Sequence, residues 1–188
     1  MSIKSGYCKS TDRSSIEDPH INETLINKMS KILLLVLEEN KKLKNYQEKI
    51  MAQRNLSFTS FKKPSLSIKD YLYHIQNYTK AEDNTLITAL MYIDRLSDIS
   101  SIIITPYNIH RIIFVAVLLA IKYNEDICFG FDYYARIAGV SKKELKKLES
   151  EFVYLIKFKL YIDKNDFEDY KLCIDDIEFD EKKKCYFI

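Results

Sequence analysis

The sequence predicts an all-α protein with one hydrophobic core. Only three Gly and three Pro occur among its 188 residues, whereas sandwiches and barrels of many short strands need frequent Gly and Pro turns. The composition is 47% hydrophobic, enough for one good-sized core and little more. Ten apolar residues, "IIFVAVLLAI" (112–121), leave no polar face on a helix. That helix must therefore be surrounded by other helices, and we expect it to be the central one.

The chain begins with a polar tail (1–20), followed by a helical N-terminal extension (21–57). Apolar residues in the extension follow a heptad-like spacing, interrupted by Glu39, which predicts one long amphipathic helix or two with a break near Asn40. The series is Leu25, Met29, Ile32, Val36, Leu43, Tyr46 and Ile50. Its apolar face is expected to pack on the protein's own core, because a coiled-coil seam needs three or more unbroken heptads.

Two helices are expected between the N-terminal extension and the central helix. Ser67 has an acidic residue, Asp70, three positions later, which is typical of an N-cap, and the helix it starts extends to about Thr79. A further amphipathic helix is predicted over residues 84–98. Thr105-Pro106 predicts the start of the central helix, because threonine can cap a helix and proline is tolerated at its first position.

Two more helices are expected after the central one. A short element over residues 133–138 should end at Gly139. Ser141 and Glu144 form a capping-box pattern for a final amphipathic helix over residues 142–158, whose predicted buried stripe is Leu145, Leu148, Phe152 and Leu155. Glu144, Lys147 and Glu151 are expected on its outer face.

Charge and motif content exclude several function classes. The 29 Lys and Arg nearly balance the 27 Asp and Glu and alternate with them, which argues against nucleic-acid binding. His20, His74 and His110 have no metal-ligand spacing, and no phosphate-binding loop or nucleophile motif occurs. We therefore expect no metal, no cofactor and no enzymatic activity of its own.

The sequence also bears on location. The longest apolar run is about half the length of a membrane span, and the N-terminus lacks the apolar stretch of a signal peptide. A cytoplasmic or nuclear protein is expected, with its four cysteines as thiols. Cys185, fourth from the end after three lysines, resembles a prenylation box. Tyr186 and Phe187 stand where aliphatic residues are usual, so membrane attachment is not expected.

Four segments together resemble the phosphate-pathway cyclins, also called the Pcl, P or U type. They are "SLSIKDYLYHIQNYTKAE" (65–82), "LITALMYIDRL" (86–96), "ITPYNIHRIIFVAVLLAIKY" (104–123) and "FDYYARIAGVSKKELKKLESEFVYLIKFKL" (131–160). The resemblance implies a single cyclin box of five helices around the buried central helix. We place this box at residues 58–162, followed by a short C-terminal extension (163–188). Ala138-Gly139-Val140 departs from the Gly-Gly-Ile usual in relatives, which affects only loop detail.

The resemblance implies a regulatory subunit that binds and activates a cyclin-dependent protein kinase. Lys122 and Glu149 match the Lys-Glu pair that cyclins use against their kinase, and Tyr123, Ile127, Phe129 and Phe152 are candidate apolar contacts. From the residues alone, Lys122 equally suits the last turn of a helix, where a lysine favours the negative end of the dipole and reaches water. The four apolar candidates equally suit the core.

Four further charged residues within predicted helices are interpreted as structural. Asp94, Arg95, His110 and Arg111 are expected to pair with neighbouring helices and fix their packing. Two other functions remain open. One is a cyclin-fold interaction module that does not activate a kinase, and the other is a dimeric coiled-coil adaptor built on the N-terminal helix.

Overall fold

The structure, a computed structural model, describes residues 21–54, 56–100 and 102–176. Within these residues the chain forms helices, turns and loops and no strand, so the predicted all-α class is confirmed. The helices, in chain order, are α1 (Glu23–Lys41), α2 (Tyr46–Ala52), α3 (Ile68–Thr79), α4 (Asp83–Ile99), α5 (Ile109–Asn124), α6 (Phe131–Ala138), α7 (Lys142–Leu155) and α8 (Lys164–Asp176).

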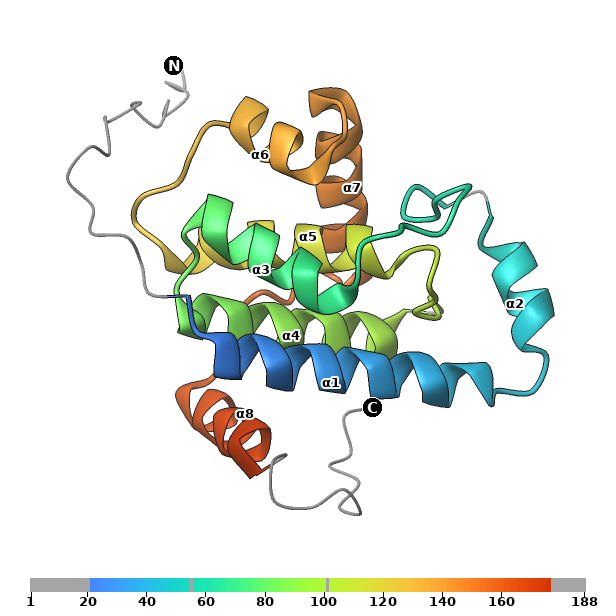
Figure 1. The fold of residues 1–188 in the computed structure, drawn as a ribbon, viewed down its shortest axis with the longest axis horizontal. Helices are drawn as coiled ribbons and strands as arrows, with labels where there is room; N and C mark the ends of the chain where they lie inside the picture. The colour runs from blue at the N-terminus through green and yellow to red at the C-terminus, as the bar shows by residue number, and fades with distance from the viewer. Residues whose placement is uncertain (1–20, 55, 101, 177–188) are drawn as a thin grey trace.

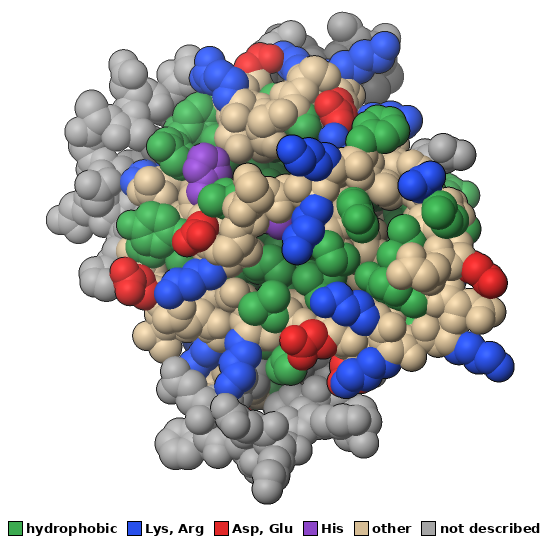
Figure 2. All heavy atoms as spheres, turned by 45° about the vertical axis from the view of Figure 1, so that its right-hand side comes forward, with side chains coloured by type: hydrophobic (Ala, Val, Ile, Leu, Met, Phe, Trp, Pro, Cys, Tyr) green, Lys and Arg blue, Asp and Glu red, His purple; other side chains and the backbone are tan. Residues whose placement is uncertain are grey.

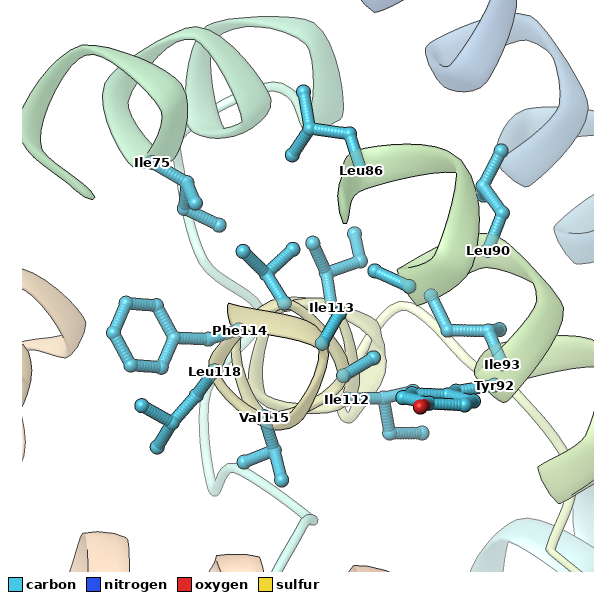
Figure 3. Packing of buried hydrophobic residues seen from close by; sticks show 14 of the residues in the cluster. Ile75, Leu86, Leu90, Tyr92, Ile93, Ile112, Ile113, Phe114, Val115 and Leu118 are labelled. Carbon is cyan, nitrogen blue, oxygen red and sulfur yellow. The ribbon is translucent and has the colours of Figure 1, made fainter. Parts of the chain in front are cut away.

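Helix α5 lies at the centre of the fold, as its unbroken apolar run predicts. Every residue from Ile112 to Ile121 is buried. Figure 3 looks along this helix and shows side chains leaving it in all directions, toward Ile75 of α3 and toward Leu86 and Ile93 of α4. Helix α1 packs against α3 and α4 packs against α5, and α3 lies above both α1 and α4 in the view of Figure 1. Because α5 is enclosed on all sides, its ends are the parts of it that reach the surface.

The start of α5 differs from the prediction. Thr105-Pro106 does not open the helix, which begins three residues later at Ile109 with Asn108 before it. The buried Asn108 side chain accepts a hydrogen bond from the Thr105 amide (2.8 Å) and donates one to the Ile103 carbonyl (2.9 Å). These two bonds hold residues 105–108 in a turn. The Asn108 side chain offers these backbone groups hydrogen bonds that are an alternative to those of a helix, as asparagine often does at turns and caps.

The N-terminal extension forms two helices, which was the second of the two predicted alternatives, and not one long helix. Helix α1 ends at Lys41 and α2 starts after Asn45, whose φ of 64° is left-handed. The apolar face of α1 is buried in the protein's own core through Leu25, Met29 and Val36. The seam that a coiled-coil dimer would use is therefore already occupied. The predicted division between residues 57 and 58 stays a prediction, although one core runs across it.

The two serine helix caps predicted from the sequence, Ser67 and Ser141, both form. Ser67 accepts from the Asp70 amide and Ser141 from the Glu144 amide, both at 3.1 Å. Gly139 ends α6 with a φ of 67°, which glycine adopts without strain. The Glu144 carboxylate, however, does not lie on the outer face. It forms an ion pair of 2.7 Å with Arg111 of α5, a helix in contact with α7.

The C-terminal extension contains a helix that the sequence analysis did not predict. Helix α8 packs against α1 and α4, and its Ile174 is buried. Lys28 of α1 pairs with Asp175 at 3.0 Å, and the Tyr170 hydroxyl hydrogen-bonds the Asp94 carboxylate of α4. Cys185, whose surroundings resemble a prenylation box, lies outside the described residues. Among those residues, Cys128 and Cys173 form no disulfide.

Charges on the surface are mixed. On the face shown in Figure 2, Lys and Arg side chains are interspersed with acidic and hydrophobic side chains and do not form a continuous stripe. Over the described parts of the chain, no helix combines the length and the apolar character needed to cross a bilayer.

Candidate functional site

Lys122 and Glu149 meet where the buried run of α5 reaches the surface. The Lys122 Nζ lies 2.5 Å from Glu149 Oε1, and the pair joins the last turn of α5 to the middle of α7. The side chain of Lys122 is 40% exposed and that of Glu149 is 16% exposed. The Phe131 ring of α6 lies beneath the ammonium group, 5.1 Å from Nζ to the ring centroid. The structure thus brings together the two residues that the sequence analysis paired.

This pair has the chemistry to bind a peptide group. An ammonium group has three donors, and Glu149 accepts one of them. The remaining donors can bind carbonyl oxygens, and a carboxylate can accept from backbone N–H groups. Glu149 also fixes the position of the lysine before any partner arrives, which reduces the entropy that binding would cost.

Two of the apolar candidates lie on the surface and one is partly covered. Tyr123 is 50% exposed next to Lys122, and Ile127 is 49% exposed in the loop after α5. Phe129 packs its ring on Tyr133 of α6, with 4.3 Å between centroids, and its amide donates to the Tyr134 hydroxyl. Tyr123 and Ile127 can therefore contribute apolar area to a contact, whereas much of Phe129 already packs within the fold.

Phe152 is a core residue, which is the alternative that the sequence left open for it, and its burial argues against a direct kinase contact. Its side chain is 0% exposed and meets the Phe58 ring edge-on at 6.1 Å. It continues the buried stripe of Leu145 and Leu148, because residues three or four apart share one face of a helix. A partner could reach it only if α7 left the core.

Phe158 is an exposed aromatic residue that was not a candidate contact from the sequence. Phe158 follows α7 and is 72% exposed. Lys157 and Phe158 are both left-handed, with φ of 54° and 58°, a conformation that costs roughly 1–2 kcal/mol for each residue other than glycine. Strained backbone of this kind is often found at functional sites. Nothing in "IKFKL" predicts this turn, because the glycine that usually marks one is absent.

The segment after Phe158 is fastened to α4 through its carbonyl groups. Arg95 donates to the carbonyls of Lys159 (2.5 Å) and Tyr161 (3.1 Å), and the Tyr92 hydroxyl donates to that of Leu160 (2.8 Å). These three bonds hold the chain that follows the left-handed turn. The predicted structural residue Arg95 therefore also contributes to the position of Phe158.

The other predicted structural residues also contact neighbouring elements. Asp94 accepts from Tyr170 of α8, and burial raises the pKa of its carboxyl group to about 7. His110 donates from Nε2 to the Leu66 carbonyl at 2.9 Å, and burial lowers its pKa. Arg111 donates to the Ser57 carbonyl at 2.6 Å in addition to pairing with Glu144. Each of the four charged residues therefore joins two segments of the fold.

In the part of the chain that the structure describes, no three His, Cys, Asp or Glu side chains are grouped closely enough to hold a metal ion. The rings of His74 and His110 both pack against the Tyr71 ring, at 6.4 Å and 4.9 Å between centroids.

Comparison with known proteins agrees with this architecture. The cyclin family model matches residues 20–160. Among curated proteins, Cyclin-U4-3 of Arabidopsis thaliana is 32% identical over 151 residues, covering 80% of this chain and 66% of the relative. Cyclin-U4-2 of the same plant is 32% identical over 152 residues, covering 80% and 69%. Cyclin-P4-1 of Oryza sativa subsp. japonica is 33% identical over 107 residues, covering 56% and 50%.

These matches have two consequences. The chain spans about two thirds of the length of the two U-type relatives, so their full activities do not transfer to it directly. The family match includes α1 as well as the segments from α3 to α7. The chain belongs to the cyclin family, and its relatives are plant U-type and P-type cyclins.

Proposed function

We propose that this protein is a regulatory subunit that binds and activates a cyclin-dependent protein kinase. Membership of the cyclin family supports a regulatory role. The observation that carries the proposal is the Lys122–Glu149 pair, in which Lys122 is 40% exposed at the end of an otherwise buried helix. Tyr123, the next residue in the chain, is 50% exposed and can add apolar area to a contact at the same place.

The proposed mechanism is positional. In a protein kinase, a glutamate on the regulatory helix must reach the lysine that binds ATP, and the position of that helix controls whether the ion pair forms. Lys122 would donate to carbonyl oxygens beside the regulatory helix, and Glu149 would accept from neighbouring N–H groups. Together they would hold the helix in its inward position.

The energy required shows that the ion pair cannot act alone. Shifting a two-state equilibrium from 1:99 to 99:1 takes about 5.5 kcal/mol of differential binding, whereas an exposed ion pair contributes up to about 1 kcal/mol. Burying a side chain such as Phe or Leu contributes roughly 1.5–3 kcal/mol. Tyr123 and Phe158, buried together at an interface, would supply most of the difference.

The test is a calorimetric titration of the purified protein against cyclin-dependent kinases of its source organism, with kinase activity measured on the same samples. We expect binding and stimulation. Lys122→Glu should weaken binding at least thirtyfold, which corresponds to about 2 kcal/mol, because a carboxylate then faces carbonyl oxygens. Lys147→Glu is the matched control, since Lys147 is an exposed lysine on α7 outside the pair.

Two outcomes would contradict the proposal. Binding without stimulation would favour the non-activating interaction module. Equal binding by the wild type and by Lys122→Glu would show that Lys122 only ends a buried helix. Circular dichroism of each variant separates a loss of binding from a loss of folding.

A further inference from the structure

The surface also carries a groove that shares only Phe158 with the proposed kinase contact. It lies between α4, the segment after α7 and α8, and it has a volume of about 870 Å³. Phe158 and Tyr161 line it, and both are exposed to water over most of their surface. Grooves that bind ligands commonly have volumes of roughly 300–1,000 Å³ and combine apolar walls with a few polar groups. The size and the aromatic walls therefore suit a short peptide segment.

The charge of the groove is mainly negative. Asp98 from α4 and Asp166 and Asp169 from α8 line it, against the two cations Arg95 and Lys159. Asp94 also lines it, but its carboxyl group accepts a hydrogen bond from Tyr170 and is not counted here. Arg95 is directed at the carbonyls of Lys159 and Tyr161. Asp98, Asp166 and Asp169 are exposed, and none of them forms an ion pair with a described residue. Nearby like charges repel each other, and a cationic ligand would relieve this repulsion.

The spacing of these carboxylates distinguishes between possible ligands. No three acidic side chains among the described residues come close enough to hold one metal ion. Charges spread over two helices fit an extended ligand that carries several cations better than they fit a single ion. The same charges would repel phosphate groups, which argues against nucleic acid and anionic lipid.

We propose that the groove between α4 and α8 binds a basic peptide segment of another protein, with aromatic or aliphatic side chains of that segment packed on Phe158 and Tyr161. The basic side chains would lie against Asp98 from one wall and against Asp166 and Asp169 from the other. The inference does not depend on kinase binding, because the residues that line the groove all belong to this chain and not to a kinase.

The proposal is tested with a fluorescently labelled octapeptide that carries three lysines and two phenylalanines. Anisotropy is measured on the whole protein. The double variant Asp98→Asn with Asp169→Asn should bind at least tenfold more weakly, and wild-type affinity should fall with added salt. The matched control is Glu38→Gln with Glu168→Gln, which removes two exposed charges outside the groove. This control should bind the peptide like the wild type.

Several results would overturn the inference: no binding at millimolar protein, equal binding of an octapeptide with glutamates in place of lysines, or an equal loss in the control variant. Amide chemical shifts in NMR spectra give a second measurement, since shifts confined to residues outside the groove would also contradict it. Lys122→Glu should bind the peptide normally. The failure of kinase binding and the failure of peptide binding are therefore separate results.

Discussion

Exchanging the charges of Lys122 and Glu149 separates their contribution to folding from their contribution to binding. Each single reversal removes an ion pair worth up to about 1 kcal/mol and places two like charges together. Charges 4 Å apart interact by ~1 kcal/mol in water and ~4 kcal/mol near a protein surface. Lys122 is 40% exposed, so the reversed side chain can turn toward water and the repulsion stays near the lower value.

The single variants should therefore lose about 1–2 kcal/mol of unfolding free energy, which lowers the melting temperature by roughly 2–8 °C for a domain of this size. The double variant, Lys122→Glu with Glu149→Lys, restores opposite charges across the same contact. Its unfolding free energy should return to within about 0.5 kcal/mol of the wild type. Circular dichroism during thermal and urea unfolding measures both quantities.

Kinase binding should not return in the double variant. The donors and acceptors have changed places, so carbonyl groups that faced an ammonium group now face a carboxylate. Calorimetric titration should show the double variant at least thirtyfold weaker than the wild type. If the exchange restores affinity together with stability, the two charges matter only to each other, and their assignment to a partner surface is refuted.

Three further predictions concern residues around this site. Phe152→Ala should lower the unfolding free energy by about 3–5 kcal/mol in urea titrations, because it leaves a cavity against Phe58. Phe158→Gly should change that free energy by less than about 1 kcal/mol, since relief of the left-handed strain offsets the greater freedom of the unfolded chain, yet it should weaken kinase binding at least tenfold by calorimetry. The folded pKa of Asp94, about 7, exceeds its ordinary value of 3.8, so its contribution to the unfolding free energy should fall by about 3 kcal/mol from pH 4 to pH 7. Asp94→Asn should flatten this pH dependence in urea titrations at several pH values.

Features that depend on short stretches of sequence could be predicted. Ser67 and Ser141 cap their helices because a serine side chain reaches an amide three residues away. The burial of α5 follows from a run of residues with no polar face. The start of α5 was predicted wrongly because Asn108 bonds to the Thr105 amide and the Ile103 carbonyl, and the sequence gives no measure of that competition.

The sequence could not settle which of the two phenylalanines after Leu148 is exposed to a partner. Phe152 and Phe158 are both apolar and close together in the chain. From the sequence only Phe152 was a candidate partner contact, and Phe152 is the one that is buried. Phe152 lies on the inward stripe of α7, whereas the left-handed turn at Lys157 and Phe158 directs the second ring outward. Arg95 and Tyr92, from a helix some 60 residues earlier, bond to the chain that follows this turn. The turn itself has no glycine to mark it in the sequence.

The sequence by itself determined that this chain is helical, that residues 112–121 are its centre, and that Lys122 is where the central helix meets water. These outcomes follow from the period of an α-helix and from the cost of exposing apolar surface, both of which act within about twenty residues. Tertiary structure alone decided that Glu144 pairs with Arg111 and that α8 closes a groove against α4. The reason is that each of these contacts joins segments that only packing brings within reach.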